Sequence, residues 1–176
     1  RRHRHGGAAM ISVVYTGRPA LDACRAALGD VAFVPLGSRC DLGVSIGGSH
    51  IFTVSEINLA RCGIVNLHFA PLPTYRGRYS AGHALRNGDP FFGVTLHYVD
   101  AGIDTGPIIG QRLFAIDAGE TVGSLRAWAF DVGVALFESW APRLLDAARQ
   151  GKRVPSWRQD ESKARYYNRA SLGLLA

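Results

Sequence analysis

The strongest constraint on the fold is a strand, turn and helix pattern at the start of the chain. Residues 10–16 read MISVVYT and end at Gly17, a short β-branched run typical of a buried parallel strand. Residues 19–28 then place apolar side chains at helical spacing and end at Gly29, which suits a helix C-terminus. The pattern predicts an α/β fold.

Three further apolar runs continue this alternation. Residues 31–36, 41–46 and 64–67 read as strands, and residues 55–60 read as a short helix before the last of them. We therefore expect a Rossmann-like, mostly parallel sheet flanked by helices. Too few residues separate the second and third strands for a crossover helix, so the N-terminal half is expected to be shortened.

The second half of the chain has a different order of predicted helices and strands. Helices are predicted over residues 79–87 and 121–150, strands over 93–99 and 108–116, and a glycine-rich loop over 100–107. The long helix carries an apolar stripe that places Trp128 and Trp140 in the core. Pro142 lies within that stripe and predicts a kink or a break into two helices.

Length and composition point to one domain. With 176 residues, 47% of them hydrophobic, the chain has enough apolar material for one core, and it has no apolar run long enough to cross a membrane. We expect residues 1–9 to lie outside the fold, residues 10–151 to form the domain and residues 152–176 to form a basic tail. Three irregularly spaced cysteines favour reduced thiols and a cytoplasmic location.

The formal charge of +6 resides at the two ends of the chain. Three arginines lie within the first four residues and a further excess of cations lies between residues 150 and 169, so the body between them is close to neutral. This distribution argues against a nucleic-acid partner. The tail suits either an anionic substrate or plain solvation.

Three polar residues form a candidate catalytic set. Asn66 and His68 end a buried strand, and Asp104 lies in the Gly-rich loop. Ligands in α/β sheets bind at the carboxyl ends of strands, and alternation puts Asn66 and His68 on one face. An amide can hold an oxyanion, an imidazole can move a proton, and a carboxylate can orient the imidazole.

The sequence around these residues resembles a known family. Residues 66–77 (NLHFAPLPTYRG), Asn87-Gly88, residues 93–97 (GVTLH) and residues 102–107 (GIDTGP) are similar to 10-formyltetrahydrofolate-dependent formyltransferases, most of all the sugar N-formyltransferases. The resemblance covers about residues 41–151, and residues 159–163 (QDESK) match more weakly. One departure is that Ala70-Pro71 stands where the family commonly has Ser-Leu.

The resemblance implies roles for individual residues. It makes Asn66, His68 and Asp104 the catalytic residues, with no metal. The segments it assigns to the folate cosubstrate contain His50, Ile51, Phe52, Ile57, Asp100, Ala101, Gly102 and Ile103. Residues after the catalytic strand are expected to line the acceptor pocket: Tyr75, Arg76, Gly77, Arg78 and Tyr79.

The resemblance also implies a reaction, with alternatives. The expected reaction is formyl transfer to the primary amine of a small molecule, most simply a nucleotide-linked amino sugar. An amino-acid or peptide-synthetase-linked acceptor, a formyltetrahydrofolate hydrolase and a noncatalytic folate-binding domain remain alternatives, and a homodimer is left open.

Several single residues carry smaller expectations. We hypothesise a cis Leu72-Pro73 bond. His97 is expected to have a structural role or a hydrogen bond to a site residue, and His83 is expected on the surface. Aromatic residues of the tail either stack on a base or pack back onto the sheet, namely Trp157, Tyr166 and Tyr167.

Overall fold

The computed structural model describes residues 10–15, 18–29, 31–168 and 170–172, so the predicted leader over residues 1–9 lies outside the described residues. A six-stranded sheet has the order β2-β1-β3-β4-β6-β7. Its strands are β1 (Met10–Tyr15), β2 (Ala32–Val34), β3 (Leu42–Ile46), β4 (Ile64–His68), β6 (Phe91–Tyr98) and β7 (Ile108–Ala115).

The first four strands run parallel, whereas β6 and β7 pair antiparallel. The predicted α/β fold with a mostly parallel sheet is therefore confirmed. No helix occupies residues 35–41 between β2 and β3, so the crossover there is the shortened one that the sequence predicted.

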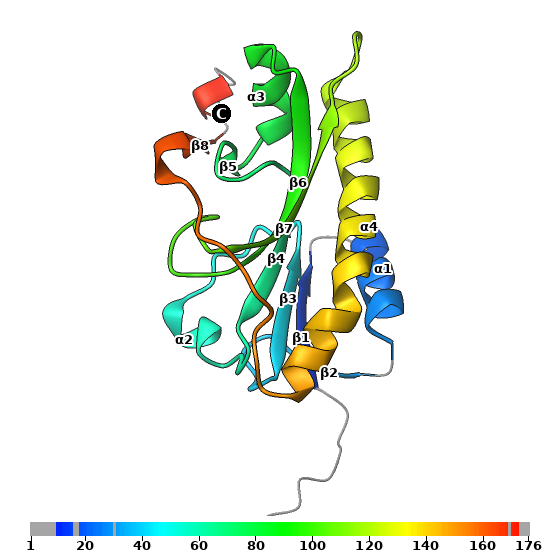
Figure 1. The fold of residues 1–176 in the computed structure, drawn as a ribbon, viewed down its shortest axis with the longest axis vertical. Helices are drawn as coiled ribbons and strands as arrows, with labels where there is room; N and C mark the ends of the chain where they lie inside the picture. The colour runs from blue at the N-terminus through cyan, green and yellow to red at the C-terminus, as the bar shows by residue number, and fades with distance from the viewer. Residues whose placement is uncertain (1–9, 16–17, 30, 169, 173–176) are drawn as a thin grey trace, which may run out of the picture.

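Helices cover the sheet unevenly. Helices α1 (Arg18–Leu28) and α4 (Val122–Arg149) lie together against one face, whereas α2 (Val54–Ile57) and the C-terminal segment run along the other side (Figure 1). Helix α3 (Ser80–Asn87) also contacts α4. Every residue of β3 is buried, and β6 and α4 contribute Phe92 and Phe137 to the same main core. No helix among the described residues is long and apolar enough to cross a membrane.

Helix α4 bears on two expectations. The expected break is not found, because α4 continues through Pro142 as one helix. Pro142 and Glu138, whose carbonyl loses its helical partner, are both exposed residues. Trp140 packs partly buried against the core, but Trp128 is 55% exposed. The core prediction for Trp128 is wrong: its ring covers Phe114 from the side, with ring centroids 6.1 Å apart.

The C-terminal segment packs back onto the domain. Strand β8 (Tyr166–Tyr167) pairs in parallel with β5 (Arg76–Gly77), and Trp157 forms a bridge with Ile108 of β7. The ring of Tyr167 stacks on Tyr75 at 5.0 Å. The expectation of a freely solvated tail is therefore wrong for residues 152–168, which we call the strap.

Two local expectations have clear outcomes. The Leu72-Pro73 peptide bond is cis, as hypothesised. His83 is fully buried, so its predicted surface position is wrong. The face of α3 that carries His83 is covered by the strap: the ring lies 4.3 Å from that of Tyr167, and Nε2 lies 3.2 Å from the carbonyl oxygen of Asn168.

Candidate active site

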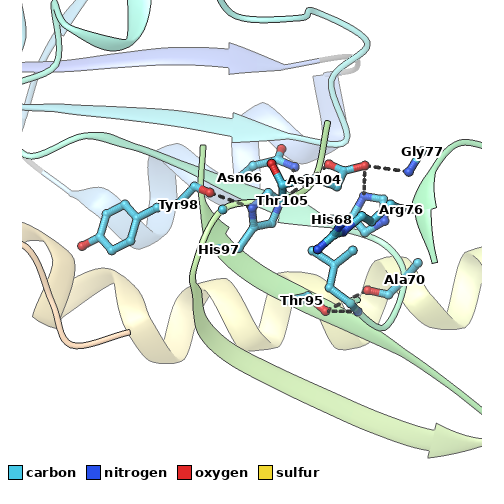
Figure 2. Close-up of polar contacts among 12 residues, drawn as sticks. Asn66, His68, Ala70, Arg76, Gly77, Thr95, His97, Tyr98, Asp104 and Thr105 are labelled. Atoms are coloured by element: carbon cyan, nitrogen blue, oxygen red, sulfur yellow. Dashed lines mark hydrogen bonds and ion pairs between the residues drawn. The ribbon is translucent and has the colours of Figure 1, made fainter. Parts of the chain in front are cut away.

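Asn66 and His68 lie on one face of β4 and line the same cavity, together with Asp104. Strand β6 runs antiparallel beside β4 and pairs His97 opposite Asn66. The side chains meet there, with Asn66 Nδ2 3.1 Å from His97 Nε2. Figure 2 shows this contact and the approach of Asp104 from the adjacent loop.

His97 has a defined protonation state. Burial, and secondarily the charge of His68, lower the pKa of His97 from 6.5 to about 4. The ring of His97 is therefore neutral near pH 7. Its Nε2 lies 3.7 Å from Asp104 Oδ1, and because the ring is neutral this contact is not an ion pair. Nδ1 lies 2.8 Å from the carbonyl oxygen of Tyr98, which can only accept, so Nδ1 carries the proton. Nε2 therefore accepts from Asn66, and this contact fixes which way the amide of Asn66 points. The second N–H of Asn66 remains for a ligand.

His68 uses one nitrogen to hold its ring in place. Its Nε2 lies 2.7 Å from the carbonyl oxygen of Tyr75, so Nε2 donates. Only Nδ1 is left to exchange a proton, and it lies 3.6 Å from Asp104 Oδ2. Both side chains are largely buried, at 12% and 15% exposed. The imidazole and carboxylate are thus paired at the edge of the cavity.

Asp104 is held by backbone geometry and by hydrogen bonds. It has a left-handed conformation, with φ of 55°, which is uncommon for a residue other than glycine. Its Oδ2 accepts the backbone N–H of Gly77 at 2.8 Å. Gly77 itself has φ of 91°, and a Cβ there would lie 2.2 Å from the carbonyl oxygen of Tyr167. Glycine at this position therefore permits both the turn and the close approach of the strap.

The residues assigned to the folate fall mostly, but not entirely, on the cavity. The cavity of about 170 Å³ is lined by His50, Ile51 and Phe52 and by Asp100, Gly102 and Ile103. Ile57 instead packs against the small apolar cluster that includes Phe52. Ala101 does not line the cavity.

The residues assigned to the acceptor divide in the same way. Gly77 and Arg78 line the cavity. Tyr75 and Arg76 are buried away from it, because Tyr75 donates its hydroxyl to Asp89 and Arg76 binds Gln159 and Glu161 of the strap. Tyr79 is 44% exposed and does not line the cavity.

Sequence reasoning missed other residues at the site. Ser45, in β3 beside Asn66, and Gly47 and Gly48 of the following turn also line the cavity. Tyr166 of the strap, for which the sequence predicts either stacking on a base or packing back onto the sheet, contributes to the lining as well. Gln159 bonds to the backbone of the Asp104 loop. Only the weak match over residues 159–163 gave any sign of this contact. Within the described part of the chain, no group of three or more His, Cys, Asp or Glu side chains is placed to hold a metal ion.

The family is shown by comparison with known proteins. A family model described as "Formyl transferase" matches residues 18–138. The chain belongs to the formyl transferase family. Among curated formyl transferases, the chain is 34% identical over 131 residues to a methionyl-tRNA formyltransferase of Syntrophomonas wolfei and 36% identical over 108 residues to one of Halorhodospira halophila. These matches cover 74% and 61% of this chain, which spans only 35–40% of the length of the curated relatives it matches.

Solved formyl transferase structures share the fold. An N-formyltransferase from Helicobacter canadensis, in complex with folinic acid and dTDP-3-aminofucose, has a TM-score of 0.76 at 20% identity and covers 93% of this chain and 72% of its own. PseJ from Anoxybacillus kamchatkensis, in complex with UDP-4,6-dideoxy-4-formamido-L-AltNAc and tetrahydrofolate, has a TM-score of 0.76 at 21% identity and covers 92% and 87%. Phosphoribosylglycinamide formyltransferase from Streptococcus pneumoniae scores 0.67 at 21% identity and covers 77% and 98%.

Proposed function

We propose that this protein transfers a formyl group from 10-formyltetrahydrofolate to the primary amine of a small molecule. The observation that carries the proposal is the meeting of Asn66, His68 and Asp104 at one cavity in a chain of the formyl transferase family. An amide donor, an imidazole and a carboxylate within reach of one ligand are the groups that acyl transfer to an amine requires.

The chemistry of the cavity suits the pterin end of the cosubstrate, which is flat and apolar on its faces and carries hydrogen-bonding groups along its edge. Along the cavity, peptide groups 48–52 make no hydrogen bonds to other peptide groups of the described residues, so their N–H and C=O groups are available to such an edge. Phe52, Leu67 and Val99 supply apolar lining. The cosubstrate would supply the activated formyl carbon and a leaving nitrogen.

Asn66 is proposed to stabilise the negative charge that forms on the formyl oxygen when the amine adds to the formyl carbon. One N–H of its amide is committed to His97, which leaves the other pointing along a fixed direction. A donor that is already oriented costs no reorganisation during the reaction, and loss of one such donor typically costs about 10²–10³ in rate.

His68 and Asp104 are proposed to manage the protons. Protonated at Nδ1, His68 is a second donor to the same oxygen, and the Asp104 carboxylate 3.6 Å away stabilises that charge. The amine loses a proton and the folate nitrogen gains one as the bond between that nitrogen and the formyl carbon breaks. Asp104 can take the first proton and return it, directly or through water.

We propose a nucleotide-linked amino sugar as the acceptor. The N-formyltransferases solved with dTDP-3-aminofucose or with a UDP-linked formamido sugar match 92–93% of this chain, and the sugar 3N-formyl transferase WlaRD matches 80%, against 77–79% for the phosphoribosylglycinamide enzymes. Arg78 and Tyr166 lie at the cavity and offer a cation for a diphosphate and a ring for a base. The curated relatives favour methionyl-tRNA as the second candidate.

The experiment is a formyl-transfer assay with both classes of acceptor. Purified protein is incubated with 10-formyltetrahydrofolate and either a panel of amino-sugar nucleotides or methionyl-tRNA, and products are scored by the mass of one added formyl group. Asn66→Ala, His68→Ala and Asp104→Ala should each lower kcat by about 10²–10³ while the thermal unfolding temperature stays close to that of the wild type.

The possible outcomes separate the alternatives. Formylated sugar nucleotide supports the proposal, and formylated methionyl-tRNA alone replaces the acceptor. Formate release without any acceptor identifies a hydrolase. A His68→Ala variant with wild-type turnover refutes the assigned mechanism.

A further inference from the structure

One side chain of the strap, Gln159, binds the backbone of the loop that carries Asp104. This amide is buried, at 9% exposed, and all its hydrogen-bonding capacity is used. Its Nε2 donates to the carbonyl oxygen of Asp104 at 2.9 Å and to that of Gly106 at 2.7 Å. Its Oε1 accepts from Arg76, from Nε at 3.1 Å and from Nη2 at 2.9 Å.

These contacts hold both partners of one hydrogen bond at the site. Asp104 Oδ2 accepts the N–H of Gly77, and Gly77 directly follows Arg76 in β5. Gln159 therefore binds the backbone of Asp104, whose carboxylate accepts this hydrogen bond. It also binds the side chain of Arg76, the residue before Gly77, whose N–H donates it. The guanidinium of Arg76 is completed by Glu161, with contacts of 2.9 and 2.6 Å.

The Asp104 loop needs such support because its conformation is costly. Asp104 has a left-handed backbone with φ of 55°, a conformation that is uncommon for a residue with a Cβ and that Asp adopts more readily than most. Two residues on, the loop passes so close to β6 that a Cβ at Gly106 would lie 1.8 Å from the carbonyl oxygen of Tyr98. The two N–H groups of Gln159 bind the carbonyl oxygens of Asp104 and Gly106. They therefore stabilise the turn on both sides of residue 105.

We propose that Gln159 is a positioning residue for Asp104, which fixes the carboxylate beside His68 from outside the cavity. This inference rests on the proposed function, in which Asp104 acts on protons. Gln159 does not line the cavity, so it acts on turnover through the groups it binds, namely the Asp104 loop and Arg76 beside Gly77. The strap is thereby part of the working site.

The test uses Gln159→Glu in the full chain. The substitution keeps Oε1 for Arg76 but replaces the donating nitrogen with an oxygen facing two carbonyls. We expect kcat for formyl transfer to fall at least tenfold, with KM for each substrate within about twofold. Glu161→Gln is the matched control, because it alters the same arginine network without touching the loop, and its kcat should stay within about twofold.

Amide hydrogen exchange supplies a readout that is independent of turnover. Among the described residues, the N–H of Gly77 donates to the Asp104 carboxylate and to no other acceptor, so its exchange should accelerate at least tenfold in Gln159→Glu. The N–H groups of Arg76 and Arg78 bond to Arg165 and Tyr167 of the strap and should keep their protection. Should the glutamate variant not fold, Gln159→Met, which removes the same donors without adding charge, is measured in the same way.

Three results would overturn the inference. The first is unchanged exchange at Gly77 in the variant, and the second is loss of protection at all three amides together, which would mean that the strap detaches. The third is a kcat of Gln159→Glu equal to that of a wild type that transfers formyl groups. If the wild type transfers no formyl group yet Gly77 exchange responds as expected, the proposed function fails and the positioning of Asp104 stands.

Discussion

Acidification provides a sharp test of the buried neutral His97. Its ring is 2% exposed, and burial together with the charge of His68 lowers its pKa to about 4 in the folded protein, against 6.5 for an ordinary histidine. As the pH falls below 6.5, the unfolded chain binds a proton at this residue before the folded protein does. Stability is therefore lost as the pH falls from about 6.5 to about 4.

The magnitude follows from the size of the shift. Each pKa unit is worth about 1.4 kcal/mol, so relative to pH 7.5 the free energy of unfolding should decrease by about 2 kcal/mol at pH 5 and by about 3 kcal/mol at pH 4 from His97 alone. The His97 ring is buried, so solvent screens its charge little.

The assay is urea unfolding of the wild type and His97→Asn at a series of pH values. Asparagine has no titrating group, so the difference between the two free energies of unfolding isolates the histidine. Between pH 7.5 and 4, the free energy of unfolding of the wild type should fall by about 3 kcal/mol relative to that of the variant. A difference that stays constant over this interval would show that His97 is not a buried neutral histidine, and the fixed orientation of Asn66 would lose its basis.

Two further substitutions test the supports of the site. Gly77→Ala would put a Cβ 2.2 Å from the carbonyl oxygen of Tyr167 at φ of 91°; we expect a loss of about 2 kcal/mol or more in urea unfolding, and a variant within 0.5 kcal/mol of wild type would contradict the tight contact with the strap. Thr95→Val removes a buried hydroxyl that donates to the carbonyl oxygen of Ala70 and accepts the N–H of Leu72; calorimetry should show about 1–3 kcal/mol of destabilisation, and a neutral result would mean that these peptide groups find other partners.

The placement of Asn66 and His68 was predictable because it depends on local geometry. Side chains two residues apart on a strand share a face whatever surrounds them, and the end of a strand in an α/β sheet is where ligands bind. The pairing with Asp104 came from the family resemblance, since spacing along the chain does not measure distance in space.

The errors concern residues whose environment is set by distant parts of the chain. His83 is buried because the strap covers its helix, although the strap lies more than 80 positions away in the sequence. Arg76 directly precedes the cavity residue Gly77, yet its guanidinium binds Gln159 of the strap, and the ring of nearby Tyr75 stacks on Tyr167. Trp128 obeys the helical spacing of core residues, but it lies at the edge of the apolar face of α4.

The amino-acid sequence by itself determined the alternation of strands and helices and the face shared by Asn66 and His68, because these follow from periodicity and burial within short segments. Only the tertiary structure decided that residues 157–167 return to the site, that His97 orients Asn66, and that Gln159 binds the Asp104 loop. Those contacts join segments tens of residues apart, and their hydrogen bonds form only after packing has removed water from the groups that make them.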